Sequence, residues 1–286
     1  MVKIIICVIA YLILAPVIGG LLAGIDRVIS ARMQGKHGPS VFQPFYDFFK
    51  LLEKEPITVN NVQDFYIACF LLFIVVTGCF FFAGMDLLLV IFTLSLASTF
   101  LIIAAFSSNS AYPQMGAERE LLQMMAYEPM VLITAIGFYL YSGSFNVADI
   151  HNSKMSFPYM IGIFAGFLFI LTIKMRKSPF DLSMSHHAHQ ELVAGLKTEF
   201  SGKTLAMVEI AHWYENIFLL GFVFLFFANG TIAGTVIGIV VCLVTYFFET
   251  FIDNNFARMK WNVALNSSWL VAITLGMINI VVLYFM

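Results

Sequence analysis

Long apolar stretches constrain the fold of this 286-residue chain more than any other feature. A bilayer core is about 30 Å thick, and a helix of about 20 apolar residues crosses it. The alternating pattern of a membrane β-barrel is absent from the sequence. We therefore predict an all-α, polytopic membrane protein, with residues 1–286 forming one membrane domain. Eight segments have the required length: 4–24, 65–83, 87–106, 121–141, 158–175, 205–227, 231–248 and 267–286.

The composition supports this class and excludes several others. Hydrophobic residues make up 60% of the chain and charged residues 11%, whereas soluble domains have about 25% charged residues. A net charge of −2 with no basic tract argues against nucleic-acid binding. These values exclude a cytosolic globular enzyme and a disordered chain, and they imply a lipid bilayer around the helices.

The distribution of positive charge predicts the orientation in the cell membrane. Apart from Lys3 and Lys154, every lysine and arginine lies in the first, third, fifth or seventh connection. Cytoplasmic loops carry such an excess, so we expect both termini outside and the long loops 25–64 and 176–204 in the cytoplasm. Bulk on one side only suggests that these two loops dock a soluble module.

Within the first loop, residues 41–54 have the pattern of an amphipathic helix. Phe42, Phe45, Phe49 and Leu52 share one face, with Asp47 opposite. The segment is too polar to span the membrane. We expect it to lie at the cytoplasmic interface or to contact a soluble partner.

Two predicted spans carry acids, which are costly in lipid and usually mark ion pathways or polar cavities. The fourth has Glu118 and Glu120 near its start and Glu128 before Pro129, and the sixth has Glu209, His212 and Glu215. Proline leaves a carbonyl free beside Glu128, and burial disfavours the anion, so this acid can carry a proton. The acids and His212 on adjoining faces are typical of a proton relay. The alternative is that these side chains only fix helix packing.

The chain shows no sign of a cofactor of its own. Its four cysteines lie inside predicted spans without metal-ligand spacing, and no nucleotide-binding glycine motif is present. His187 and His189 are too weak a pattern for a zinc site. We expect no metal or cofactor in this chain, and any metal centres in partner subunits.

Three ordered motifs carry a family resemblance. The first motif is Arg32-Met33-Gln34-Gly35-Lys36-His37-Gly38-Pro39, followed by Gln43, Asp47 and Lys50. The second comprises Gly116-Ala117, Arg119, Gln123 and Tyr127-Glu128, and the third comprises Pro179-Phe180-Asp181-Leu182, Glu191-Leu192-Val193-Ala194-Gly195 and Glu199-Phe200-Ser201-Gly202. Together they resemble subunit 1 of respiratory complex I and its hydrogenase relatives.

Departures from the complex I pattern favour the hydrogenase branch. An acid-rich run before Glu191 is replaced by His187-Ala188-His189, and the acid pair before Pro179 is replaced by Lys174 to Lys177. This form is similar to the membrane subunit of Ech-type energy-converting nickel–iron hydrogenases. The resemblance implies a foundation subunit that couples ferredoxin-linked hydrogen production or oxidation to proton or sodium translocation.

The same resemblance implies partners. They are the hydrogenase large and small subunits with a nickel–iron centre, a ferredoxin-like subunit with iron–sulfur clusters, and an antiporter-like membrane subunit. Two sets of residues follow as candidates. For a proton path they are Glu118, Glu120, Glu128, Asp181, Glu191, Glu199, Glu209, His212 and Glu215, and for partner docking they are Arg32, Gln43, Asp47, Lys50, His187 and His189.

Other functions stay open on this evidence. A quinone-binding subunit of a complex I-type dehydrogenase would need a cavity near Arg32, Phe45 and Tyr127. A passive anchor of a formate-linked hydrogenase would use the acids for packing alone. A free-standing transporter is disfavoured because no internal inverted repeat is evident.

Overall fold

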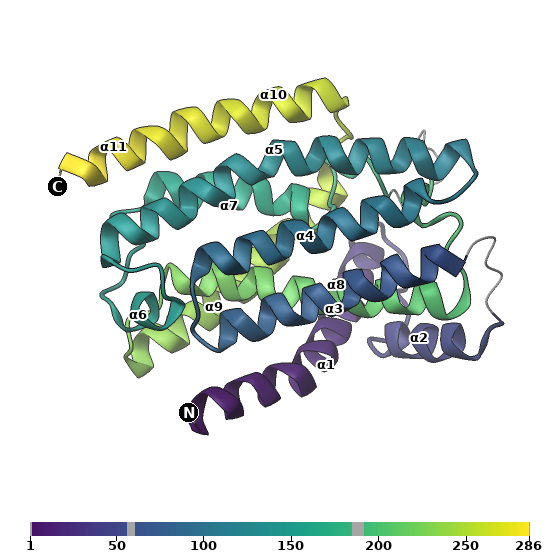
Figure 1. Ribbon diagram of the computed structural model, residues 1–286, viewed down its shortest axis with the longest axis horizontal. Coiled ribbons are helices and arrows are strands. Elements are labelled where there is room, and N and C mark those ends of the chain that lie inside the picture. Colours follow the sequence, from purple (N-terminus) through teal and green to yellow (C-terminus); the bar gives the residue numbers. More distant parts are fainter. Residues whose placement is uncertain (1, 56–60, 185–191, 286) are drawn as a thin grey trace.

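The computed structural model describes residues 2–55, 61–184 and 192–285, and it confirms the all-α prediction (Figure 1). An isolated β-bridge joins Asp86 and Asn146. A short 3-10 helix, η1, and a π-helical segment, η2, interrupt the α-helices. The elements are α1 (Val2–Met33), α2 (Gln43–Glu53), α3 (Asn61–Phe82), α4 (Leu87–Phe106), α5 (Ala111–Ser142), α6 (Val147–Asn152), α7 (Ile161–Lys174), η1 (Gly195–Lys197), α8 (Gly202–Leu225), α9 (Ile232–Asn255), α10 (Trp261–Val271), η2 (Ala272–Met277) and α11 (Ile278–Phe285).

Seven described helices are long and apolar enough to cross a membrane, with α10, η2 and α11 forming one continuous helix. The remaining predicted span, 158–175, forms the 14-residue α7. Asn279 of α11 compensates for this short helix: its Oδ1 accepts from the Ile163 amide at 3.3 Å, and its Nδ2 donates to the Tyr159 carbonyl at 3.1 Å. Backbone groups at membrane depth need such partners because lipid offers none.

Two helices continue beyond the predicted apolar spans. Helix α1 runs to Met33, so the prediction that the first long loop begins at residue 25 is wrong. Helix α5 begins at Ala111, which places Glu118 and Glu120 inside a helix. Polar residues can extend a helix once it has left the apolar layer, since their side chains then find charged or hydrogen-bonding partners.

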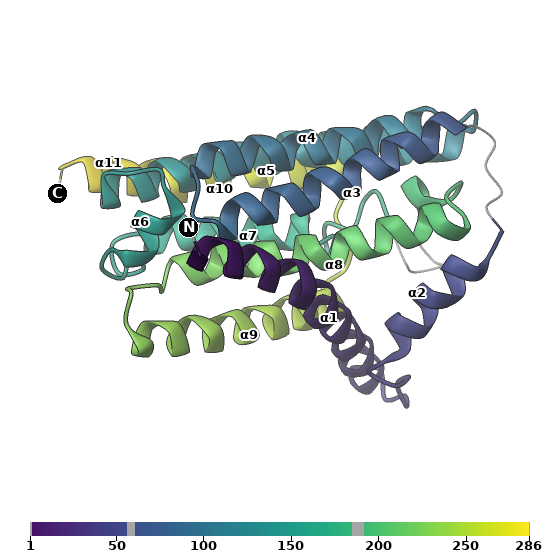
Figure 2. The same cartoon turned by 60° about the horizontal axis from the view of Figure 1, so that its bottom comes forward.

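A proline bends the first helix. Pro16 lies inside α1, and the two halves of α1 run in different directions in Figure 2. Proline cannot donate to the carbonyl four residues earlier, which here belongs to Leu12. The Tyr214 hydroxyl of α8 donates to that carbonyl at 2.8 Å. The bend is therefore tied to α8 by a hydrogen bond that a straight helix could not accept.

Close approach of α1 to the segment Val41–Phe45 depends on two glycines. A Cβ atom on Gly20 would lie 2.5 Å from the Phe45 ring, and one on Gly24 would lie 1.9 Å from the Val41 carbonyl oxygen. The Phe45 ring centroid is 5.3 Å from that of Trp213. The amphipathic helix is therefore confirmed as α2, held on the bundle by an aromatic contact.

The predicted apolar face of α2 divides in two. Phe45 packs inward together with Phe48, whose ring centroid lies 5.6 Å from that of Trp213. Phe42 and Phe49, in contrast, are each 59% exposed. A helix at a bilayer interface can turn such residues toward lipid.

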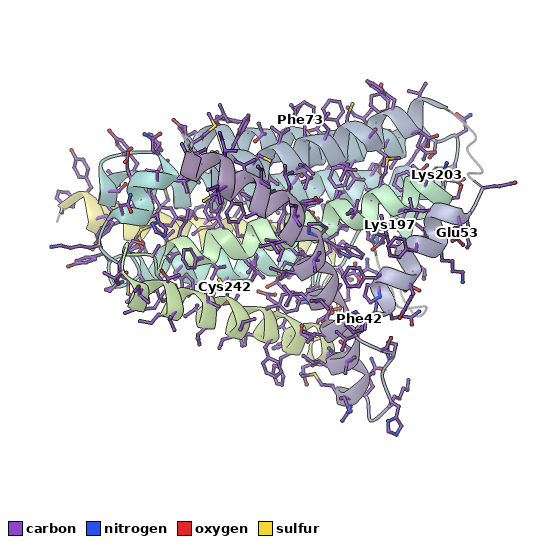
Figure 3. The ribbon with its side chains drawn as sticks, turned by 90° about the horizontal axis from the view of Figure 1, so that it is seen from below. Phe42, Glu53, Phe73, Lys197, Lys203 and Cys242 are labelled. Atoms are coloured by element: carbon purple, nitrogen blue, oxygen red, sulfur yellow. The ribbon has the colours of Figure 1, made fainter. Side chains whose placement is uncertain are left out.

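The molecule is asymmetric from end to end. Both termini lie toward the end of the bundle opposite α2 (Figure 1). Lys197, Lys203 and Glu53 gather at the α2 end, while Cys242 lies along α9 toward the other (Figure 3). The assignment of the α2 end to the cytoplasm stays a prediction.

We expect Tyr214→Phe to loosen α1 from α8. The variant keeps the ring but leaves the Leu12 carbonyl without its donor, and the free energy of unfolding should fall by about 1 kcal/mol. Thermal unfolding in detergent measures the change. Tyr46→Phe is the matched control, since Tyr46 is 64% exposed. Equal melting of the two variants would contradict this role for the hydroxyl.

Candidate functional site

A strained backbone position organises a buried group of charges. Helix α7 ends at Lys174, and two residues later Arg176 has a φ of 54°, in the left-handed region that glycine usually occupies. The Arg176 amide donates to the Ile173 carbonyl at 3.0 Å and the Lys177 amide donates to the Thr172 carbonyl at 3.0 Å. An L-residue there costs about 1–2 kcal/mol. Contacts made by the arginine side chain offset that strain.

The Arg176 guanidinium bridges two helices. Its Nη2 lies 2.9 Å from Glu120 Oε1 on α5, and its Nη1 lies 3.2 Å from Glu215 Oε2 on α8. Both carboxylates are almost fully buried, at 4% and 2% exposed. Burial alone lowers the pKa of Arg176, but the two anions outweigh it and the net pKa is raised. The guanidinium therefore stays charged between two acids.

His212 joins this group, and the same ring nitrogen contacts both the guanidinium and one carboxylate. Its Nδ1 lies 3.1 Å from Arg176 Nη1 and 3.2 Å from Glu215 Oε2. A ring nitrogen either accepts from the guanidinium or donates to the carboxylate, depending on the tautomer. Its Nε2 is buried without a hydrogen-bond partner among the described residues. His212 can therefore change partner without a large movement.

Lys174 neutralises the second oxygen of Glu215. Its Nζ lies 3.0 Å from Glu215 Oε1, 2.9 Å from Ser98 Oγ and 3.1 Å from Tyr127 Oη. The same ammonium lies 4.6 Å from the centroid of the Tyr127 ring. Lys174 is itself 6% exposed. Four helices, α4, α5, α7 and α8, therefore meet around one buried ammonium.

The segment after α7 is held against α5 by side chains from two of the sequence motifs. Ser183 Oγ donates to Glu120 Oε2, and Gln123 Nε2 donates to the Phe180 carbonyl. A Cβ atom on Gly116 would lie 2.5 Å from the Leu196 amide nitrogen. The three contacts bring the Gly116–Glu128 motif together with Phe180, Ser183 and Leu196, so these described residues of the predicted docking loop pack on their own chain.

Lys177 forms a second ion-paired group beside the first. Its Nζ contacts Asp26 of α1 and lies 3.2 Å from Asp253 Oδ2 of α9, and the Ser178 amide donates to Asp253 Oδ1 at 2.8 Å. Burial lowers the pKa of Lys177, but the two carboxylates raise it more, so the net pKa is raised. This lysine ties the loop to α1 and α9.

Both groups border a cavity of about 480 Å³. Its charged lining is balanced, with the cations Arg27, Arg176, Lys177 and Lys197 and the anions Asp26, Asp181, Glu209 and Asp253. The volume is ample for several water molecules, which need polar partners of this kind. The arrangement can hold water in contact with buried acids.

The predicted proton-path residues separate into two sets. Glu120, His212 and Glu215 meet around Arg176, Asp181 and Glu209 line the cavity, and Lys197 Nζ lies 2.8 Å from Glu209 Oε1. The others lie apart: Glu118 is exposed on α5, Glu128 and Glu199 are half-buried outside the contacts described around Arg176, and Glu191 falls outside the described residues.

The burial of three cations was not predicted from the sequence. Lys174, Arg176 and Lys177 count as charges of the fifth connection in the orientation argument. Arg176 and Lys177 do follow the end of α7, and all three cations are buried against acids. A run of three cations directly after an apolar span, in a chain with acids in other spans, is the signal that could have located them. Glu249 of α9 was missed altogether because it lies one residue beyond the predicted span 231–248.

Two of the predicted docking residues have partners within the chain. Arg27 Nη1 lies 2.6 Å from Asp47 Oδ2, and Gln43 Nε2 donates to Asp47 Oδ1 at 3.0 Å. Arg32 and Lys50 are exposed, so their docking role stays a prediction. His187 and His189 lie outside the described residues.

Comparisons with known proteins agree with the motifs. The sequence model of the family described as NADH dehydrogenase matches residues 3–284. Hydrogenase-4 component C of Escherichia coli K12 is 25% identical, with 87% of each chain covered. Formate hydrogenlyase subunit 4 of the same organism is 26% identical, covering 87% of this chain and 89% of the relative. A chain in the structure of the membrane-bound sulfane sulfur reductase, an archaeal respiratory membrane complex, has the same fold, with a TM-score of 0.88, 24% identity, and 98% of this chain and 99% of that chain covered.

We expect Arg176→Met to destabilise the chain by about 3–5 kcal/mol, the usual effect of removing one partner of a buried pair. Chemical unfolding in detergent measures it. Adding Glu120→Gln should recover most of the loss, because the remaining Glu215 stays paired with Lys174 and no uncompensated charge is left. A double variant as unstable as the single one would show that packing, not charge, is responsible.

The Asp47 contact predicts a pH dependence for α2. Partial burial raises the pKa of Asp47, but hydrogen bonds from Arg27 and Gln43 lower it more, so the net pKa is lowered. A depressed pKa means that the contact stabilises the fold above the ordinary aspartate value and is lost as the pH falls below about 4. The protection of the α2 amides against hydrogen exchange should fall there. Asp47→Asn should show the lower protection already at neutral pH. Unchanged exchange in the variant would argue against the contact.

Proposed function

The chain belongs to the NADH dehydrogenase family, and from this premise we propose that it is the membrane foundation subunit of an energy-converting nickel–iron hydrogenase. In this role it docks the hydrogenase module and couples ferredoxin-linked hydrogen production or oxidation to proton or sodium translocation. Similarity to a hydrogenase component over 87% of the chain supports the assignment. The metal centres would lie in the large, small and ferredoxin-like subunits, with an antiporter-like subunit beside this chain in the bilayer.

The buried bridge from Arg176 to Glu120 and Glu215 carries the proposal. Arg176 belongs to the loop that a soluble module would touch, whereas both acids belong to helices inside the bundle. If the module displaces this loop, the guanidinium moves away from the acids. The group then holds two carboxylates and one cation, Lys174. A buried carboxylate without a counter-charge is strongly disfavoured and takes up a proton. Loop movement would thereby become proton uptake.

Return of the loop would release the proton. A guanidinium that re-enters the site favours the two anions again, and that proton leaves through water in the cavity. His212 can exchange its partner between Arg176 and Glu215 during this movement. Coupling of this kind requires that adjacent acids titrate together, as neighbouring buried groups do.

Quinone binding receives less support. The cavity of about 480 Å³ has a balanced ionic lining that does not include Arg32, Phe45 or Tyr127. The small space that does border Tyr127 has a volume of about 20 Å³, which is far below the several hundred Å³ of typical small-molecule sites. The passive-anchor alternative differs in its prediction: neutral replacements would impair assembly and leave ion translocation unchanged.

We expect Glu215→Gln in the intact complex, reconstituted in vesicles, to retain hydrogen turnover and lower the ions translocated per hydrogen, because glutamine cannot take up the proton that a buried carboxylate binds when its cation leaves. Asp149→Asn, at an exposed acid of α6, is the control and should behave as wild type. Full translocation in Glu215→Gln would contradict the coupling role, and loss of assembly with normal translocation in the remaining complex would favour the anchor.

A further inference from the structure

Helix α9 carries a buried acid that lies outside the ion-paired group around Arg176. Glu249 of α9 is 1% exposed. Tyr246 and Asp253, three residues before and four after, fall within about 60° of it around the helix. Both of these neighbours line the cavity of about 480 Å³. Glu249 therefore lies on the cavity side of α9, within about one turn of two residues that line the cavity.

The contacts of Glu249 differ from those of Glu120 and Glu215. Glu120 and Glu215 each have a cation within 3.2 Å. The described hydrogen bond of Glu249 is a long one, 3.4 Å from Thr172 Oγ1 of α7 to its Oε1. Its Oε2 is buried without a hydrogen-bond partner among the described residues. A carboxylate in this setting would be largely uncompensated.

The Thr172 hydroxyl suits a neutral acid better than an anion. The same Oγ1 lies 3.4 Å from the Leu168 carbonyl one turn earlier in α7. A hydroxyl has one hydrogen to donate and can also accept. When that hydrogen goes to Leu168, Oγ1 can accept a hydrogen bond from a protonated Glu249. The carboxylate form would have to compete with the Leu168 carbonyl for the single donor.

Neighbouring elements supply no free counter-charge in the described residues. Lys177 faces Glu249 from the loop, but its ammonium already contacts Asp26 of α1 and Asp253 of α9. That group of three carries a net charge of −1 and does not favour a further anion. The α8 side chains packed against α9 here, Ile217 and Leu220, are apolar.

We propose that Glu249 is a proton-binding site inside the membrane domain, which carries a proton at neutral pH and exchanges it with water in the neighbouring cavity along the Tyr246–Asp253 face of α9. In the exchange, the Glu249 O–H bond breaks, a cavity water becomes hydronium, and the reverse step restores both. Its part in ion translocation rests on the proposed function, whereas its protonation does not.

Infrared spectroscopy of the intact complex tests the protonation. The difference spectrum between wild type and Glu249→Gln at neutral pH should show the loss of one protonated-carboxyl C=O band. Thr172→Val should shift that band to higher frequency, because its hydrogen-bond acceptor is gone, and Asp149→Asn should leave it unchanged. A difference spectrum without the band would overturn the proposal, as would a band that vanishes when sodium is raised at constant pH, since the site would then bind sodium.

Access to the cavity has its own test. In D₂O the band should shift to lower frequency as the proton is replaced, and Tyr246→Phe should slow that shift. A band that never shifts would show a carboxyl sealed from the cavity and would overturn the exchange.

The number of ions translocated per hydrogen by the Glu249→Gln complex tests the transport role of Glu249 separately from the coupling role of the group around Arg176. A fall in ions per hydrogen supports a transport role for Glu249, and normal translocation overturns that role. Neither result depends on the effect of Glu215→Gln, so the two proposals can fail separately.

Discussion

The structure depends on one guanidinium placed between two acids in the interior of a membrane protein. Arg176 reaches both Glu120 and Glu215 because its backbone adopts a left-handed conformation at the end of α7. Neither acid could stay charged in an apolar bundle without a cation, and an unpaired arginine would be equally unfavourable. Each member of the group therefore requires the others, and the helices that carry them are held in one arrangement.

This mutual dependence links the loop to the membrane interior. Ser183 and Phe180, from the segment after Arg176, bind Glu120 and Gln123 on α5. A displacement of the loop would disturb the ion pairs, since the same few residues belong to both. An electrostatic connection of this kind does not require a continuous chain of contacting residues. It requires one element whose position decides which charges have a counter-charge.

The buried acids divide according to their counter-charges. Glu120 and Glu215 are compensated by Arg176 and Lys174, so their protonation follows the movement of cations. Where those acids have a cation, Glu249 has the hydroxyl of Thr172, so its protonation follows access to water. Two kinds of proton site in one bundle would respond to different events, one to loop position and one to hydration of the cavity.

The sequence by itself determined the class of fold, the family resemblance and the amphipathic helix α2, because apolar length, motif order and a 3.6-residue period are properties of local sequence. It also located Glu120, His212 and Glu215 as unusual residues. Only the tertiary structure decided that Lys174, Arg176 and Lys177 turn inward, that Glu118 faces out, and that Glu249 is buried beside a cavity. The reason is physical: the state of a charge depends on which opposite charge lies within a few ångströms, and these partners come from segments up to 151 residues apart in the chain.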